Sequence, residues 1–91
     1  MSHEAMNWAV QQRLGAKQKL LLIMLAFHAA RETHCCSLSR RKLSVLCGMS
    51  IDSVKRALPE LVAMDLISVE FRVDEGTNLP NAYTLKVGEP A

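Results

Sequence analysis

The apolar positions between Ser39 and Ile67 follow two short helical periods with a break between them. Leu43 and Leu46 lie three residues apart behind Ser39, a residue type that caps the N-termini of helices. Gly48 then interrupts the pattern, and glycine tolerates the positive φ that a tight turn between helices often needs. The stretch therefore predicts a helix, a tight turn and a second helix.

The second helix is predicted to begin after a Ser50 cap and to continue to Met64. Its core face is expected to be apolar, at helical spacing: Val54, Leu58, Leu61 and Val62. Pro59 lies inside it and cannot donate to the Lys55 carbonyl, so a kink near Leu58 is expected. The outward face is then short, polar and basic: Asp52, Ser53, Lys55 and Arg56.

Two further helical patterns precede this unit. The first covers Ala5–Arg13, and Trp8 within it is expected to pack on the core, with a self-association surface as the alternative. The second, Ala16–Arg31, is apolar nearly all round after its lysines. That composition predicts a central helix covered on several sides.

Strand patterns flank the pair of helices. Glu32–Leu38 breaks the helical periodicity and could hold a short strand, while Ile67–Val73 and Tyr83–Val87 alternate apolar and polar residues like a β-hairpin. The connection Asp74–Asn81 contains turn residues and is long for a hairpin, so it is expected to project as a loop. The predicted fold class is mainly α with a small β-hairpin (α+β).

Composition and cysteine usage bound the class of protein. The chain has 91 residues, 49% hydrophobic and 22% charged, which indicates one folded domain. Its longest apolar run, Leu20–Phe27, is far shorter than the roughly 20 residues of a membrane span. Three cysteines, two of them adjacent, argue against a disulfide framework and for the cytoplasm. We expect an N-terminal helical extension (1–15), the domain itself (16–87), and a tail or linker start (88–91).

Positive charge is concentrated on the predicted helix pair. The net charge is only +2, yet five of the 11 lysines and arginines lie between Ser39 and Arg56, against the single carboxylate of Asp52. Such a cluster on one unit is typical of a surface that meets phosphates, whereas a solvated basic face is the alternative. The coincidence with the pair of helices favours the first interpretation.

The order of these elements resembles the winged helix-turn-helix domains of plasmid and phage replication proteins and of many bacterial regulators. The similarity spans Ala16–Leu85 and depends on these residues: Lys19–Ala26, Ser39, Leu43, Gly48, Ser50, Val54, Leu61, Leu66, Ile67, Asn81, Tyr83 and Leu85. Two positions depart from it, because Asp65 stands where the family usually has the glycine that ends the helix and Pro59 lies inside the second helix. The resemblance implies that the chain binds double-stranded DNA, with the helix from Ile51 in the major groove.

Three groups of residues are predicted to contact the DNA. Base edges and nearby phosphates would be met by Ser50, Asp52, Ser53, Lys55 and Arg56, although Asp52 is more simply explained as a partner of the helix dipole. The DNA backbone would be met by Ser39, Arg40, Arg41 and Lys42. The wing would contribute Arg72, Thr77 and Asn78, next to the unfavourable charges of Asp74 and Glu75.

The sequence also bears on three other functions. A zinc site would use residues that fall within twenty positions, but their spacing matches no known ligand pattern, so no metal or cofactor is expected: His28, His34, Cys35, Cys36 and Cys47. An enzyme is not expected, since no nucleophile triad, phosphate loop or paired acids occur. A winged-helix protein-interaction module stays an alternative, but it would not need Lys55 and Arg56 on the exposed face of the second helix. Nor would it need the three cations at Arg40–Lys42, which oppose the local helix dipole.

The expected function is therefore sequence-specific DNA binding by a plasmid- or phage-type regulator or maintenance factor. Repeated sites and more than one copy of the chain are expected, with Met6, Trp8 and Val10 as the candidate contact surface for a homodimer. The DNA-binding domain of a replication initiator is the alternative within the same class.

Overall fold

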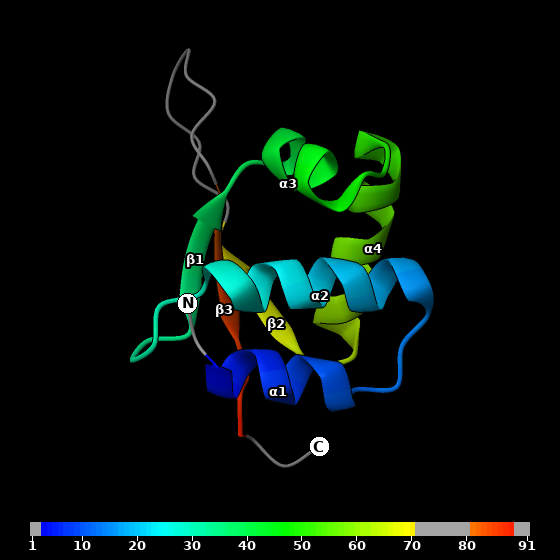
Figure 1. The fold of residues 1–91 in the computed structure, drawn as a ribbon. Helices are drawn as coiled ribbons and strands as arrows, with labels where there is room; N and C mark the ends of the chain where they lie inside the picture. Colours follow the sequence, from blue (N-terminus) through cyan, green and yellow to red (C-terminus); the bar gives the residue numbers. More distant parts are fainter. Residues whose placement is uncertain (1–2, 71–80, 89–91) are drawn as a thin grey trace.

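Four helices and a small antiparallel sheet make up the protein (Figure 1), which is described here from a computed structural model covering residues 3–70 and 81–88. The order of elements is α1 (His3–Gln11), α2 (Ala16–His28), β1 (Cys35–Leu38), α3 (Arg40–Cys47), α4 (Ile51–Ala63), β2 (Ile67–Glu70) and β3 (Asn81–Leu85). This arrangement confirms the predicted class, mainly α with a small antiparallel β-hairpin, and is that of a winged helix-turn-helix.

Helix α2 is the centre of the fold and lies between α1 and α3 (Figure 1). One face of it is completely buried: Leu21, Leu22, Leu25 and Ala26. The opposite face is only partly covered, because Leu20 and Phe27 are 39% and 40% exposed. The other sides contact α1, α3, α4 and the sheet, which confirms the prediction of a central helix covered on several sides. None of the helices that the structure describes is long and apolar enough to cross a membrane.

Helix α1 packs its small residues against this same core. Ala5 and Ala9 are fully buried, and Trp8 is half-buried and packs against the core, which confirms the packing interpretation of that side chain. The bounds differ from the predicted Ala5–Arg13 by two residues at each end.

Helix α2 ends three residues before the predicted Arg31. Ala29 already has an extended backbone, with φ −73° and ψ 142°. The following turn is closed by two backbone hydrogen bonds, from Ala30 N–H to the Cys35 carbonyl (2.9 Å) and from His34 N–H to the Ala30 carbonyl (2.9 Å). The chain therefore turns early into β1, and His28 at the helix end lies with Nδ1 2.9 Å from the Met24 carbonyl oxygen, a partner that the sequence did not indicate.

The sheet has three strands, in the order β1-β3-β2. Both pairs are antiparallel, and Tyr83 at the centre of β3 faces Cys36 of β1 and Val69 of β2 in the register. The predicted alternation is confirmed in the described strands, since Ile67, Tyr83 and Leu85 are buried while Ser68 and Glu70 are exposed. The predicted strand end at Phe71–Val73 and the predicted loop to Pro80 lie outside the described residues.

The connection from α4 to β2 explains one departure from the family pattern. Met64 is the C-cap and Asp65 has φ 61°, the left-handed conformation for which glycine is the usual residue. Aspartate tolerates this conformation better than most side chains, and its carboxylate forms an ion pair with Lys86. The position therefore keeps the backbone of a helix-ending glycine without being one.

Candidate nucleic-acid interface

Two serine caps and one left-handed glycine build the pair of helices α3 and α4. The Ser39 hydroxyl oxygen accepts from the Lys42 N–H (3.0 Å), and the Ser50 hydroxyl oxygen accepts from the Ser53 N–H (3.1 Å). Gly48 has φ 65° and ψ 33° at the turn. The predicted caps and turn are confirmed. Ser39 and Ser50, which are also predicted to contact DNA, therefore stabilise the N-termini of α3 and α4.

Helix α4 buries a stripe that is slightly rotated from the predicted one. Its fully or nearly fully buried residues are Val54, Ala57, Leu58 and Leu61. Val62, predicted to face the core, is 43% exposed. It follows Leu61 by one residue, which is about 100° around the helix, so it lies at the edge of the stripe and Ala57 takes its place on the core.

The outward face of α4 carries the predicted polar side chains. Asp52, Lys55 and Arg56 are exposed and Ser53 is half-buried. Asp52 lies in the first turn, where the helix dipole favours a negative charge. The helix continues through Pro59 to Ala63, and Pro59 is itself exposed on this face.

The first turn of α2 lies against α4 and adds a cation that the sequence analysis missed. Lys17 Nζ donates to the Ser53 hydroxyl oxygen (3.3 Å), and the Gln18 side-chain amide donates to the Glu60 carboxylate. Lys17 is 36 residues before Ser53 in the chain, so only tertiary packing brings it to this surface. The available signal was a lysine two residues after the break at Gly15, which places it in the first turn of a helix.

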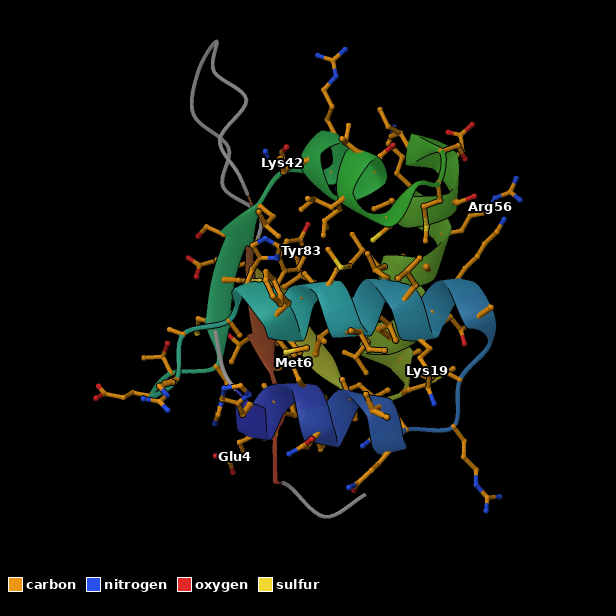
Figure 2. The ribbon with its side chains drawn as sticks, in the orientation of Figure 1. Glu4, Met6, Lys19, Lys42, Arg56 and Tyr83 are labelled. Carbon is orange, nitrogen blue, oxygen red and sulfur yellow. The ribbon has the colours of Figure 1, made fainter. Side chains whose placement is uncertain are left out.

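The cations are arranged on both sides of α4. On one side, Lys17 and Arg56 line a hollow of about 410 Å³ between α2 and α4. On the other side, Arg40 and Lys55 line a groove of about 450 Å³ between α3, α4 and β2. Arg41 and Lys42 are exposed on α3, and Figure 2 shows Lys42 and Arg56 at opposite ends of the unit.

The third predicted group of DNA contacts is the wing. Arg72, Thr77 and Asn78, together with Asp74 and Glu75, lie outside the described residues. Those contacts stay predictions.

The cysteines are placed as structural thiols. Burial, together with the neighbouring Cys35, raises the pKa of Cys36 to about 12, and burial raises the pKa of Cys47. Both thiols therefore stay protonated and poorly nucleophilic at neutral pH. Across residues 3–70 and 81–88, no group of three histidine, cysteine or acidic side chains is placed to hold a metal ion.

Comparison with known proteins supports the assignment of the helix pair. A family model described as a helix-turn-helix domain matches residues 12–67, from just before α2 to the start of β2. No curated protein and no solved structure matches the chain. Helix-turn-helix domains bind DNA by placing the second helix of the pair in the major groove. In this chain the second helix is α4. The matched region covers more than half of the 91 residues, and the chain therefore belongs to this helix-turn-helix domain family.

Proposed function

We propose that this protein binds double-stranded DNA sequence-specifically, with α4 in the major groove. The observation that carries the proposal is the pair of cationic flanks on α4, Lys17 and Arg56 on one side, Arg40 and Lys55 on the other. A helix in the major groove has a sugar–phosphate backbone on each side of it, about 12 Å apart. Cations on both flanks suit that environment, whereas a surface for an acidic protein would not require them on two sides.

The side chains divide into base readers and backbone contacts. Arg56 projects from the outward face and is the group suited to donate to guanine O6 and N7. Lys17, Arg40, Arg41, Lys42 and Lys55 would neutralise phosphates, which set affinity and register but carry little sequence information. Asp52 complements the helix N-terminus, and the proposal assigns no catalytic step to any residue.

The biological role that fits best is a regulator or site-marking factor of plasmid or phage type. Support for it is the similarity of element order to domains of that origin. One short helix reads only a few base pairs, and a module of this size buries roughly 600–1,000 Å² on DNA. Useful specificity over a genome therefore calls for several copies of the chain, bound to repeated sites or as a dimer.

Selection from random duplexes tests the proposal directly. We expect the selected duplexes to share one short motif. On the DNA flanking the protein's own gene, footprints should cover regions that contain this motif at least twice. Sedimentation should then find more than one protein per duplex. Recovery of random sequences at physiological salt would contradict sequence-specific binding, and one protein on one short footprint would contradict the multi-copy part.

A variant of Lys17 tests whether the flank between α2 and α4 contacts a DNA phosphate. Replacing Lys17 by Ala should lower the affinity for the selected duplex and reduce the slope of log K against log[salt] by about 0.9, the value for one lost phosphate contact. Lys19→Ala is the control, because Lys19 Nζ donates to the Val10 carbonyl on α1 (2.8 Å) instead. Equal slopes for the two variants would remove Lys17 from the interface.

A further inference from the structure

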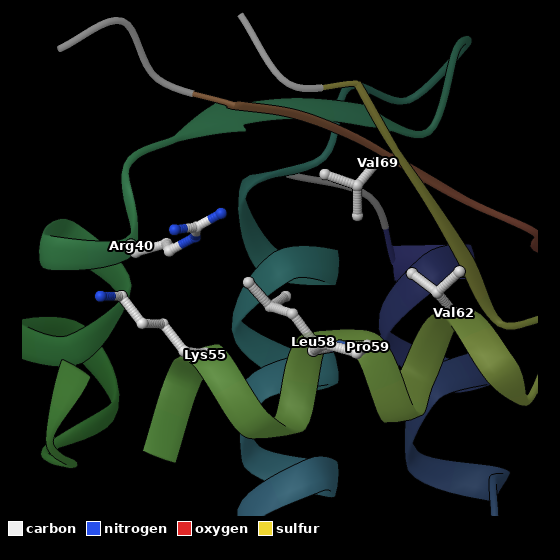
Figure 3. A pocket seen from close by; sticks show the side chains of 6 residues that line it. All are labelled: Arg40, Lys55, Leu58, Pro59, Val62 and Val69. Carbon is white, nitrogen blue, oxygen red and sulfur yellow. The ribbon is translucent and has the colours of Figure 1, made fainter. Parts of the chain in front are cut away.

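A groove on one side of α4 combines two cations with an apolar wall (Figure 3). Helices α3 and α4 and strand β2 form it, and its volume is about 450 Å³. Small-molecule sites in proteins span roughly 300–1,000 Å³ and are mostly apolar with a few polar groups. The lining residues are Arg40, Lys55, Leu58, Pro59, Val62 and Val69.

The two ends of the groove differ in chemistry. Arg40 from α3 and Lys55 from α4 lie together at one end, while Val62 and Val69 lie toward the other (Figure 3). A guanidinium and an ammonium group attract an anion, and aliphatic side chains favour an apolar group. The groove is therefore complementary to a molecule with one anionic end and one apolar body.

DNA accounts for the cationic end of the groove but not for the apolar end. A phosphate needs cations and hydrogen-bond donors, and it gains nothing from the valines. Val62, 43% exposed on the edge of α4, and Val69, half-buried on β2, together line this end of the groove with apolar surface. Exposed apolar surface next to polar groups is typical of a ligand-binding groove.

We propose that this groove binds an amphipathic anion, a carboxylate on a medium-length aliphatic body, and that the bound anion competes with DNA for Arg40 and Lys55. The competition rests on the proposed DNA binding, whereas the ligand site itself does not. Because coupling between two ligands is reciprocal, DNA should weaken the binding of the anion by the same factor by which the anion weakens the binding of DNA.

Methyl NMR tests the site without DNA. Adding octanoate should shift the methyl signals of Leu58, Val62 and Val69 in a saturable way. Octan-1-ol lacks the charge and acetate lacks the apolar body, so each should need at least about a tenfold higher concentration. Absence of saturable shifts at these residues, or equal responses to octanoate and octan-1-ol, would overturn the proposal.

Matched variants separate the two ends of the groove. Val62→Gln, which removes part of the apolar wall, and Lys55→Gln, which removes one cation, should each raise the octanoate concentration at half-saturation by at least about fivefold. Val45→Gln is the control, since Val45 is 73% exposed on α3 and does not line the groove. Circular dichroism confirms folding of each variant. Equal half-saturation for all three variants and the unmodified protein would contradict the site.

Fluorescence anisotropy with the selected duplex tests the competition. Octanoate at a concentration that just saturates the unmodified protein should raise the dissociation constant for DNA by at least about fivefold in that protein and in the Val45→Gln variant. At the same concentration the rise should be much smaller in the Val62→Gln variant, which binds octanoate more weakly. Saturable octanoate binding with an unchanged dissociation constant would overturn the competition. Failure to select any duplex would contradict the proposed function, and the NMR result would still decide the ligand site.

Discussion

Replacing Arg56 by Ala is expected to raise the dissociation constant for the selected duplex about 5- to 150-fold, equivalent to about 1–3 kcal/mol. Arg56 is exposed on α4, on the flank that it shares with Lys17, and its long side chain is suited to reach base edges. A lost bidentate contact to guanine should also relax preference at one or two base pairs of the motif. Anisotropy titrations on the motif and on its single-base variants measure both effects.

The exposed Arg31 supplies the matched control. It lies in the turn after α2, at the opposite end of that helix from Lys17 and the hollow beside α4. Arg31→Ala removes the same charge and should leave both affinity and base preference nearly unchanged. An Arg56→Ala variant that loses affinity equally for all sequences would show that Arg56 contacts phosphate and reads no base.

Local chemistry made much of the helix pair predictable. A serine before a helix and a glycine between two helices have the same effect in most proteins, because cap hydrogen bonds and left-handed backbone depend on neighbouring residues alone. Ser39, Gly48 and Ser50 therefore took their expected places. The buried alternation of Ile67, Tyr83 and Leu85 was equally local, since it follows from the period of a strand.

Features that depend on tertiary packing were missed. Val62 fits a helical apolar pattern, but the buried stripe of α4 is rotated by part of a turn from the predicted one. Val62 is therefore exposed, and Ala57 is buried in the core. Hydrophobic periodicity fixes such a stripe only to within the width of a side chain, because small residues such as alanine do not mark it. Leu20 and Phe27 are exposed because neither α1 nor α3 covers that face of α2, which no pattern within α2 records.

In the candidate site, too, the arrangement of the cations depends on tertiary packing and could not be predicted from the sequence. Counting along the chain placed five cations in one group, whereas the fold divides them between the two flanks of α4 and the exposed face of α3. It also brings Lys17 to one of these flanks. Sequence therefore indicated that the helix pair meets phosphates, but the two-sided arrangement that supports a major-groove helix required the contacts between α2 and α4.

Replacing Tyr83 by Ala is expected to lower the free energy of unfolding by about 3–5 kcal/mol, the usual cost of removing a buried aromatic ring. Tyr83 is fully buried at the centre of β3, the middle strand of the sheet, and lies inside the molecule beneath the helices (Figure 2). A domain of this size has a total of roughly 5–15 kcal/mol, so the loss is a large share. Urea unfolding followed by circular dichroism measures it.

Two further variants separate the ring from other contributions to the stability of the sheet. Tyr83→Phe keeps the ring and removes the hydroxyl, so it should cost about 1 kcal/mol, the typical worth of one hydrogen bond. Ser68→Ala on the exposed face of β2 should cost less than that.

The apparent DNA affinity of Tyr83→Ala should fall only by the fraction of molecules that are unfolded, because Tyr83 contributes to the core and lines neither flank of α4. If Tyr83→Ala unfolds at the same urea concentration as the unmodified protein, the ring does not hold the sheet to the helices. If its affinity falls while it is fully folded, the sheet positions α4 more directly than its place in the core implies.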